Sequence, residues 1–275
     1  MTPEQQTEAV RCYLAGETRN SLAIRYKASR PFVTDMLHRH GIICRATVDI
    51  RRTKLPYGDV FASAETNDEA AYWVGFLMAD GCISQQKHTD YLILQLASVD
   101  IAHIERLRDF IGVPNKITII KPTTSITPRG IVHKSEHARL CIASQPLIDS
   151  LAKYGVVPRK SKTARVISLE NNPHFWRGVI DGDGHMRFQQ RAGHCRTAVL
   201  NLVGSELLVN QFRDYIRTFT DFNGSVYFSR GAWCIMVCTR IAARVIHHLY
   251  HNPPVALPRK LKTAEEIIAH YDGRI

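Results

Sequence analysis

The sequence lacks long hydrophobic runs and paired-cysteine motifs. No uninterrupted apolar stretch in its 275 residues approaches the roughly 20 that a membrane-spanning helix needs, and no signal-peptide pattern opens the chain. The seven cysteines are odd in number and form no Cys-x-x-Cys pair. With 45% hydrophobic and 22% charged residues, we expect a soluble intracellular protein, in the cytoplasm, nucleoid or an organelle, whose cysteines are mostly reduced and buried.

The sequence is also short of acidic residues. It has 25 Asp and Glu against 36 Lys and Arg, so its net charge is +11 and its isoelectric point is about 9.5. Such an excess suggests a polyanionic partner, because basic side chains that neutralise phosphates release condensed counterions. Ribosomal, membrane-surface and nuclease proteins share this property. Residues 1–55 hold ten Lys or Arg against five Asp or Glu, so the bias is concentrated, though not confined, there.

Residues 1–45 are expected to form three short helices, at about 3–16, 18–26 and 29–41. A proline stands in the first turn of the first helix, and Ser29 is placed to cap the third. The order resembles a helix-turn-helix domain of the resolvase or homeodomain-like kind. That resemblance implies a third helix that enters the DNA major groove and exposes Arg30, Thr34, Asp35 and His38. A small helical cap with a solvated basic face is the alternative.

The remainder of the chain contains an internal duplication. Residues 46–66 have no sustained period and contain breakers, so they are expected to form a basic linker. Beyond it, WVGFLMADG at Trp73–Gly81 recurs as WRGVIDGDG at Trp176–Gly184, and two further blocks recur in the same order. The two halves, 67–170 and 171–275, each read as helix, strand pair, helix, strand pair, helix. This pattern predicts an α+β duplication with mainly antiparallel strands.

Small residues recur four apart in each motif. Gly75 precedes Ala79 by one helical turn, and Gly178 precedes Gly182 in the same way. This spacing leaves a stripe without side-chain bulk on each helix, and two such stripes let helix backbones approach closely. The motifs are therefore expected to pack against each other as a helix-helix seam.

Each motif ends in aspartate followed by glycine. We expect Gly81 and Gly184 to end the helices in the left-handed conformation, which leaves Asp80 and Asp183 side by side at two helix C-termini. Two carboxylates beside two negative helix ends repel each other unless a cation bridges them. A hard divalent metal such as Mg²⁺ would neutralise this negative charge, and the carbonyls of Ala79 and Gly182 are further candidate ligands.

These motifs resemble those of the LAGLIDADG homing endonucleases in their single-chain, two-motif form, over residues 67–275. The resemblance implies two pseudo-symmetric αββαββα halves whose antiparallel sheets form a saddle over DNA. It also implies metal-dependent cleavage of both strands, with Mg²⁺ as cofactor and Mn²⁺ able to substitute. Asp80 and Asp183 would hold the metals, and Lys160 and Lys260 of the repeated PRK blocks would be the basic residues near each site. A solvated loop charge is the alternative role for these lysines, and Arg159, Lys162, Arg259 and Lys262 are near alternatives.

Strand parity supplies candidate DNA contacts, because alternate residues of a strand share one face. After the motifs these are Ser84, Gln86 and His88 in the first half and Arg187, Gln189 and Arg191 in the second. Gln95 and Asn201 occupy matching polar positions on the second strands, and Lys116, Arg139, Ser225 and Tyr227 are weaker candidates. Gln and Arg can read base edges bidentately. A solvated sheet face is the alternative for all of them.

Three details depart from this pattern or compete with it. The sixth motif position is Met78 in the first copy and Asp181 in the second, where the namesake pattern has aspartate, but it is not the metal ligand expected in the family. His185 is placed either to contact phosphate or to pack. Cys234 and Cys238, near three histidines at 247, 248 and 251, invite a zinc site, but the apolar strand around them favours core cysteines.

Three functions fit the sequence. The first is a monomeric, site-specific endonuclease acting on double-stranded DNA, intron-encoded or free-standing, whose helix-turn-helix extends the footprint. The second is a DNA-binding transcriptional regulator that does not cleave, and the third is an RNA maturase that assists splicing of intron RNA. No membrane partner is expected. The intact Asp80 and Asp183 favour the first function over the second, whereas the residues do not separate endonuclease from maturase.

Overall fold

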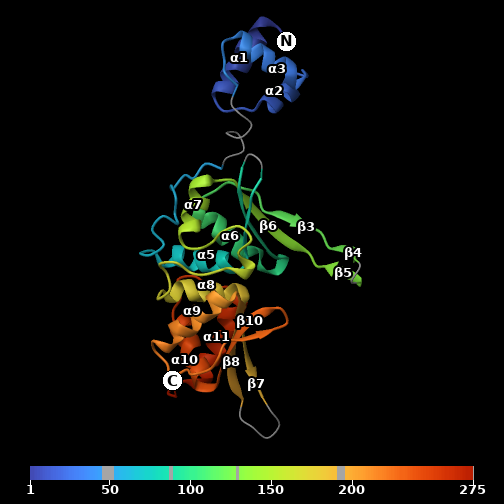
Figure 1. The fold of residues 1–275 in the computed structure, drawn as a ribbon. Helices are drawn as coiled ribbons and strands as arrows, with labels where there is room; N and C mark the ends of the chain where they lie inside the picture. The colour runs from blue at the N-terminus through green and yellow to red at the C-terminus, as the bar shows by residue number, and fades with distance from the viewer. Residues whose placement is uncertain (45–52, 87–88, 128–129, 191–195, 275) are drawn as a thin grey trace. The chain divides into compact units, whose positions relative to one another are not determined.

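The chain forms two compact units, Met1–Arg52 and Thr53–Ile275, each with its own hydrophobic core. The computed structural model describes residues 1–44, 53–86, 89–127, 130–190 and 196–274 (Figure 1). The candidate DNA contacts His88 and Arg191 lie outside the described residues, as does Cys195.

The smaller unit consists of α1 (Pro3–Leu14), α2 (Arg19–Arg25) and α3 (Arg30–Arg39). Each helix begins at a hydroxyl side chain that accepts a backbone N–H of the first turn, and these caps are Thr2, Thr18 and Ser29. The core between the helices consists of Ala9, Tyr13, Leu22, Ala23, Val33, Met36 and Leu37. The predicted positions of the three helices are confirmed to within about two residues.

The first half of the larger unit follows the predicted order of elements. Its main elements are α5 (Asp68–Ala79), β1 (Gly81–Ser84), β2 (Tyr91–Ala97), α6 (Ile101–Ile111), β3 (Thr118–Ile120), β6 (His137–Ile142) and α7 (Gln145–Lys153). Two 3-10 turns accompany them, η1 (Ser98–Asp100) and η2 (Lys160–Lys162). A separate hairpin of β4 (Thr123–Thr127) and β5 (Gly130–Lys134) stands between β3 and β6 and was not predicted.

The second half repeats the first with one addition. Its elements are α8 (Pro173–Asp183), β7 (Gly184–Gln189), β8 (Thr197–Gly204), α9 (Glu206–Arg217), β9 (Tyr227–Ser229), β10 (Ala232–Cys238), α10 (Thr239–Tyr250) and α11 (Pro258–Tyr271). The matching PRK blocks adopt different structures. The first leads into the 3-10 turn η2, whereas the second forms the first turn of α11. Each half carries a four-stranded antiparallel sheet, in the orders β1-β2-β6-β3 and β7-β8-β10-β9. The predicted α+β duplication is confirmed at this level.

The sheets have one buried and one open face, as strand alternation requires. Leu92, Leu94 and Leu96 of β2 are buried, whereas Gln95 between them is exposed. Across the sheet Gln95 pairs with Arg139 of β6. The helices of each half cover the buried face and leave the other face open.

The two halves meet along α5 and α8, whose contact is the most extensive between any two described helices (Figure 1). Glycine makes this approach possible. A Cβ atom added to Gly75 would lie 2.0 Å from the carbonyl oxygen of Phe175, and one added to Gly178 would lie 2.1 Å from that of Tyr72. Real Cβ atoms do not approach backbone so closely, so the small-residue stripes form the predicted seam.

The glycines that end the motifs do not adopt the predicted left-handed conformation. Gly184 is extended, with φ −84° and ψ 161°, and both glycines are the first residues of strands. A Cβ atom on Gly81 would lie 2.5 Å from the carbonyl oxygen of Leu77, and one on Gly184 would lie 2.6 Å from that of Ile180. Glycine is therefore required for close approach to the last helical turn, not for a positive φ.

The segment expected to be a linker packs into the larger unit over its second part. Residues 45–52 lie outside the described residues, but Phe61 and Ala64 are completely buried in the larger core. Thr53 donates its backbone N–H to the carbonyl of Ala143 and accepts the N–H of the same residue at its hydroxyl. Residues 53–66 thus pack onto the first half. Their sequence has no sustained period, so this packing could not be recognised from the sequence.

The cysteines are less buried than expected. Of the six that the structure describes, all are free and only Cys234 is buried, whereas Cys82 and Cys238 are exposed. Cys82 and Cys238 lie on the open faces of the sheets, and Cys234 is buried although it shares the face of Cys238. The prediction of mostly buried thiols was therefore wrong for the described cysteines, because three more, Cys12, Cys44 and Cys141, are only half-buried.

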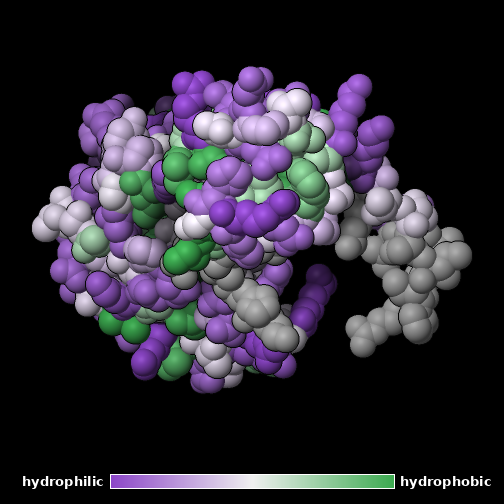
Figure 2. Space-filling view, turned by 90° about the horizontal axis from the view of Figure 1, so that it is seen from above, coloured by the Kyte–Doolittle hydropathy of each residue, from purple (hydrophilic) through white to green (hydrophobic). Residues whose placement is uncertain are grey.

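The surface drawn in Figure 2 is largely hydrophilic, with smaller hydrophobic patches between the polar side chains. Among the described residues, no helix is long and apolar enough to cross a membrane.

The seam can be tested by adding one methyl group to it. Gly75→Ala should lower the free energy of unfolding by about 1–3 kcal/mol, because the new Cβ atom would overlap the Phe175 carbonyl and force the helices apart. Urea denaturation of the whole chain measures the change. Gly204→Ala is the matched control, because its Cβ atom would find its nearest neighbour at 3.5 Å, an ordinary contact. A Gly75→Ala protein as stable as the wild type would contradict the tight seam.

Candidate active site

The two motif aspartates lie at the C-terminal ends of the seam helices. Asp80 caps the end of α5, and Asp183 is the last residue of α8. Both are exposed, in contrast to the buried turns that precede them. A Cβ atom added to Gly182 would lie 2.3 Å from the Ala79 Cβ and 3.3 Å from Asp80 Oδ2. The carboxylate of the first half therefore lies against the helix of the second, and the structure brings the predicted pair together.

The environment of the aspartates disfavours their negative charge. The protein around Asp183 displaces water and, together with the neighbouring Asp80 carboxylate, raises its pKa to about 6. The surrounding protein likewise displaces part of the water near the exposed Asp80 and raises its pKa, although Lys260 and then Lys160 oppose the shift. Because the two carboxylates repel each other, nearby positive charge is needed to stabilise both in their ionised form.

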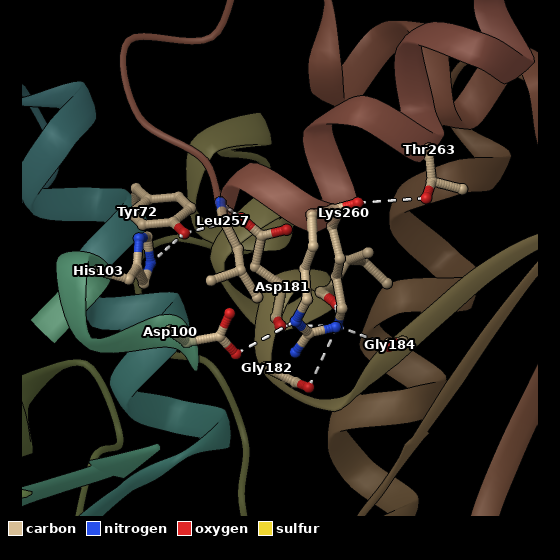
Figure 3. A network of polar contacts seen from close by, with 11 residues as sticks. Tyr72, Asp100, His103, Asp181, Gly182, Gly184, Leu257, Lys260 and Thr263 are labelled. Carbon is tan, nitrogen blue, oxygen red and sulfur yellow. Dashed lines mark hydrogen bonds and ion pairs between the residues drawn. The ribbon is translucent and has the colours of Figure 1, made fainter. Parts of the chain in front are cut away.

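Lys160 and Lys260 supply part of that charge from buried positions. Their residues are only 8% and 7% exposed, which is rare for lysine and requires polar partners. Nζ of Lys260 donates to the carbonyls of Ile180 at 2.7 Å, Asp181 at 2.6 Å and Gly184 at 2.7 Å, with Gly182 at 3.3 Å (Figure 3). Nζ of Lys160 donates to the carbonyl of Gly81. Each ammonium thus neutralises the negative end of a motif helix.

The lysines are arranged crosswise between the halves. Lys260 is the strongest of the charges that lower the pKa of Asp80, and Lys160 is the strongest of those that lower the pKa of Asp183. Lys160 and Asp183 also line one small cavity together with Met78 and Ala79. Each aspartate therefore feels the positive charge of both lysines, and the lysine of the opposite half has the larger effect.

The alternative basic residues of the PRK blocks do not occupy equivalent positions. Arg159, Lys162 and Lys262 are exposed. Arg259 forms an ion pair with Asp100 of the first half, with Nε and Oδ2 3.2 Å apart (Figure 3). Only Lys160 and Lys260 of the two blocks are buried against the motif ends.

The donor atoms at this site suit a hard divalent cation. Carboxylate and carbonyl oxygens are the ligands that Mg²⁺ prefers, and it usually retains several waters. Among the described residues, no group of three or more His, Cys, Asp or Glu side chains is placed to hold a metal. A metal here would therefore bind Asp80 and Asp183 together with backbone carbonyls, water or substrate oxygens. Of the candidate carbonyls, that of Gly182 already accepts Lys260.

Comparison with known proteins identifies the fold. No family model and no curated protein matches the sequence. The LAGLIDADG meganuclease I-CpaMI bound to uncleaved DNA is similar in structure, with a TM-score of 0.53, 12% identity and coverage of 75% of this chain and 91% of that chain. The meganuclease I-AabMI bound to uncleaved DNA has a TM-score of 0.50 at 14% identity, with 75% and 90% covered. The homing endonuclease I-WcaI bound to its DNA recognition sequence has a TM-score of 0.50 at 15% identity, with 75% and 93% covered.

The chain has the LAGLIDADG fold.

Within this LAGLIDADG fold, the open face of the first sheet carries several predicted DNA contacts. Gln95 and Arg139 are exposed and directly paired, and Thr118 pairs with Arg139 on the next strand. Ser84 is half-buried at the end of β1, whereas Gln86 and Lys116 are exposed beyond the strand ends. Strand parity would also have found Cys82, and the cross-strand register places Tyr91 and His137 on the same face.

The open face of the second sheet is organised in the same way. Arg187 is exposed and Gln189 half-buried on β7, and the exposed Ser225 and Tyr227 lie before and on β9. Asn201 pairs with His185 and Met236 across three strands, and its side-chain oxygen is buried without a hydrogen-bond partner. His185 is exposed and Met236 is 44% exposed, so the strand pattern places both on this face.

The smaller unit exposes most of its predicted contacts. Arg30, Asp35 and His38 of α3 are exposed. Thr34 is half-buried, and its hydroxyl donates to the Arg30 carbonyl. The zinc alternative in the larger unit has no support in the part of the chain that the structure describes, since Cys234 lies in the strand β10 and no metal-binding cluster surrounds it.

Ionisation of Asp183 should make the stability of the protein depend on pH. Its folded pKa of about 6 is above the ordinary value near 3.9, so the folded state holds this proton more tightly and stability falls as pH rises from about 4 to about 6. Asp183→Asn should therefore raise the free energy of unfolding at pH 8 in metal-free buffer, by at most about 1 kcal/mol because solvent screens an exposed charge. At pH 4 the gain should vanish.

Chemical denaturation at both pH values tests this expectation. Asp149→Asn, at an exposed position on α7, is the control and should show no such pH-dependent gain. Equal effects of Asp183→Asn at pH 4 and pH 8 would contradict the electrostatic account of the site.

Proposed function

We propose that this chain is a site-specific homing endonuclease that hydrolyses phosphodiester bonds on both strands of DNA in a metal-dependent reaction. The observation that carries the proposal is the pair Asp80 and Asp183, exposed side by side at the ends of two tightly packed helices. Each carboxylate has a buried lysine from the opposite half as its strongest cationic neighbour.

The duplication suits a duplex substrate. The two strands of DNA are antiparallel, so their phosphates are related by local twofold axes, which protein symmetry commonly mirrors. A pseudo-twofold pair of sites at the seam would address one phosphate on each strand. The open sheet faces beside it carry Gln95, Arg139 and Arg187, side chains that can contact base edges.

The residues of the site have distinct roles in this proposal. Asp80 and Asp183 would hold Mg²⁺, with Mn²⁺ able to replace it. When bound, the metal would acidify water and stabilise a leaving oxygen. Lys160 and Lys260 would hold positive charge beside the phosphate as negative charge develops on it. The net charge of +11 favours approach to DNA.

The similar solved structures support a DNA partner. I-CpaMI, I-AabMI and I-WcaI are all described in complex with DNA, and they cover three quarters of this chain. The smaller unit would act as a helix-turn-helix that lengthens the bound site, with Arg30 and His38 of α3 facing the groove.

Neutralising either aspartate should abolish double-strand cleavage. Asp80→Asn and Asp183→Asn remove the charge that would hold the metal, so each should reduce the rate of double-strand cutting at least 100-fold while DNA is still bound. Cleavage of a library of DNA sites in Mg²⁺ buffer and a gel-shift measurement test this outcome. Asp149→Asn is the control and should cut normally. Normal cutting by either active-site variant would refute the metal assignment.

The same proteins separate a nuclease from a regulator. Mg²⁺ should raise the midpoint of thermal unfolding of the wild type, since a ligand that binds the folded state stabilises it. The doubly substituted Asp80→Asn, Asp183→Asn protein should lose that shift. Tight, specific DNA binding without any cleavage by the wild type would favour the non-cleaving regulator.

The role of the smaller unit is testable through the salt dependence of binding. Arg30→Ala should weaken DNA binding and, if the side chain contacts phosphate, reduce the slope of log affinity against log salt by about one. The cutting rate of bound DNA should not change, because the site lies in the other unit. Arg11→Ala is the control, an exposed arginine on α1 paired with Glu8. Identical binding by Arg30→Ala and the wild type would refute the role of α3.

A further inference from the structure

The second motif differs from the first by two polar residues that are completely enclosed. Arg177 replaces the apolar Val74, and Asp181 replaces Met78. The two side chains are 1% and 0% exposed. Burying charged groups is unfavourable unless hydrogen bonds compensate, so both must be tightly held.

Asp181 accepts three hydrogen bonds. Tyr72 donates its hydroxyl to Oδ2 at 2.7 Å, and Leu257 donates its backbone N–H to Oδ2 at 2.7 Å (Figure 3). Tyr250 donates its hydroxyl to Oδ1 at 2.6 Å. Tyr72 belongs to α5 of the first half, whereas Tyr250 and Leu257 flank the connector between α10 and α11. The carboxylate therefore joins the seam to that connector.

A histidine extends the network into the first half. The single hydroxyl proton of Tyr72 goes to Asp181, so Nε2 of His103, 2.8 Å from the same hydroxyl oxygen, must be the donor in that contact. Burial lowers the pKa of His103 to about 3, so the ring is neutral, and the contact with Tyr72 assigns its one proton to Nε2. A chain of donors thus runs from His103 through Tyr72 to Asp181.

Arg177, one helical turn before Asp181 on α8, binds the same connector. Its guanidinium donates to the carbonyl of Val255 at 2.8 Å and to that of Leu249 at 3.1 Å. Together with Asp181, it fixes both ends of the segment from Leu249 to Leu257 on α8. Both polar residues that distinguish the second motif, Arg177 and Asp181, therefore bind the same segment.

The segment from Leu249 to Leu257 leads directly into α11, whose first turn carries Lys260. Leu257 caps α11, and its carbonyl accepts the backbone N–H of Lys260 at 2.9 Å. The carbonyl of Asp181 accepts Nζ of Lys260 at 2.6 Å. The side chain of Asp181 thus holds the start of the helix while its main chain holds the amine that the same helix carries.

We propose that Asp181, with Arg177 and Tyr250, is a positioning residue that fixes Lys260, and that the two active sites are unequal because the first half has no counterpart. Val74 and Met78 stand in the matching places, and Lys160 lies on a short 3-10 turn. This inference rests on the proposed nuclease function. Partners that orient groups at such sites are typically worth roughly 10- to 100-fold in activity.

Strand-resolved cleavage is the direct test. Tyr250→Phe removes only one hydroxyl from Asp181, and it should slow cutting of one strand roughly tenfold, so that nicked DNA accumulates, with unchanged DNA affinity. The slowed strand should be the one slowed by Lys260→Met and not the one slowed by Lys160→Met. Tyr215→Phe is the matched control, because it removes a buried hydroxyl bonded to His248 outside the network. Equal slowing of both strands, or of neither, would overturn the proposal.

A double-mutant cycle distinguishes positioning from general destabilisation. Asp181→Met copies the first motif, and its effect should not add to that of Lys260→Met but should add to that of Lys160→Met. Asp181→Asn keeps one acceptor oxygen and should recover part of the lost rate. Additive effects with Lys260→Met would overturn the proposal.

Hydrogen exchange tests the same idea without cleavage. The amides of residues 255–261 should exchange faster in Asp181→Met than in the wild type or Tyr215→Phe, because the Leu257 N–H loses its acceptor. Unchanged exchange would overturn the positioning role. A wild type that cuts no DNA but shows this exchange difference would instead refute the proposed function and leave the network assignment intact.

Discussion

The close approach of α5 and α8 is the constraint on which the rest of the structure depends. The carbonyl oxygens of Phe175 and Tyr72 occupy the space where Cβ atoms of Gly75 and Gly178 would otherwise stand. Because the backbones touch there, the two helix ends come together, and the strands that follow at once open into two separate sheets. The packing of one pair of helices therefore places both carboxylates and both open sheet faces.

That placement concentrates negative charge, and the chain answers it with buried lysines. Two helix C-termini and two carboxylates meet at one point. Desolvation by the surrounding protein, together with the neighbouring Asp80 carboxylate, raises the pKa of Asp183. Lys160 and Lys260 reach the helix ends from the segments that close each half. The lysine of the opposite half is the strongest cation acting on each motif aspartate. The ion pair of Arg259 with Asp100 also links the two halves. Electrostatic interactions thus link the halves at the site, and close packing of the two helices at their glycines links them along the seam.

Much of this could be predicted from sequence, where the signal is local or repeated. The seam glycines and the two aspartates follow from residue type and spacing. The conformation of Gly81 and Gly184 was missed, because close approach to a carbonyl and a positive φ both select glycine. The partners of Arg177 and Asp181 were also missed, because they lie about 70 or more residues away in the chain or across the seam, and no local pattern encodes such contacts. The different structures of the matching PRK blocks have the same origin, because tertiary context decides whether a short sequence continues as a helix.

The central claim is that the seam brings Asp80 and Asp183 together to hold metal against DNA. A crystal of the protein with DNA and Mn²⁺, measured for anomalous scattering, tests it most directly. We expect anomalous peaks within bonding distance, about 2.0–2.2 Å, of oxygens of both carboxylates, each shared with a DNA phosphate. Bound DNA with Mn²⁺ at neither aspartate, or with Mn²⁺ at a different part of the protein, would contradict the account.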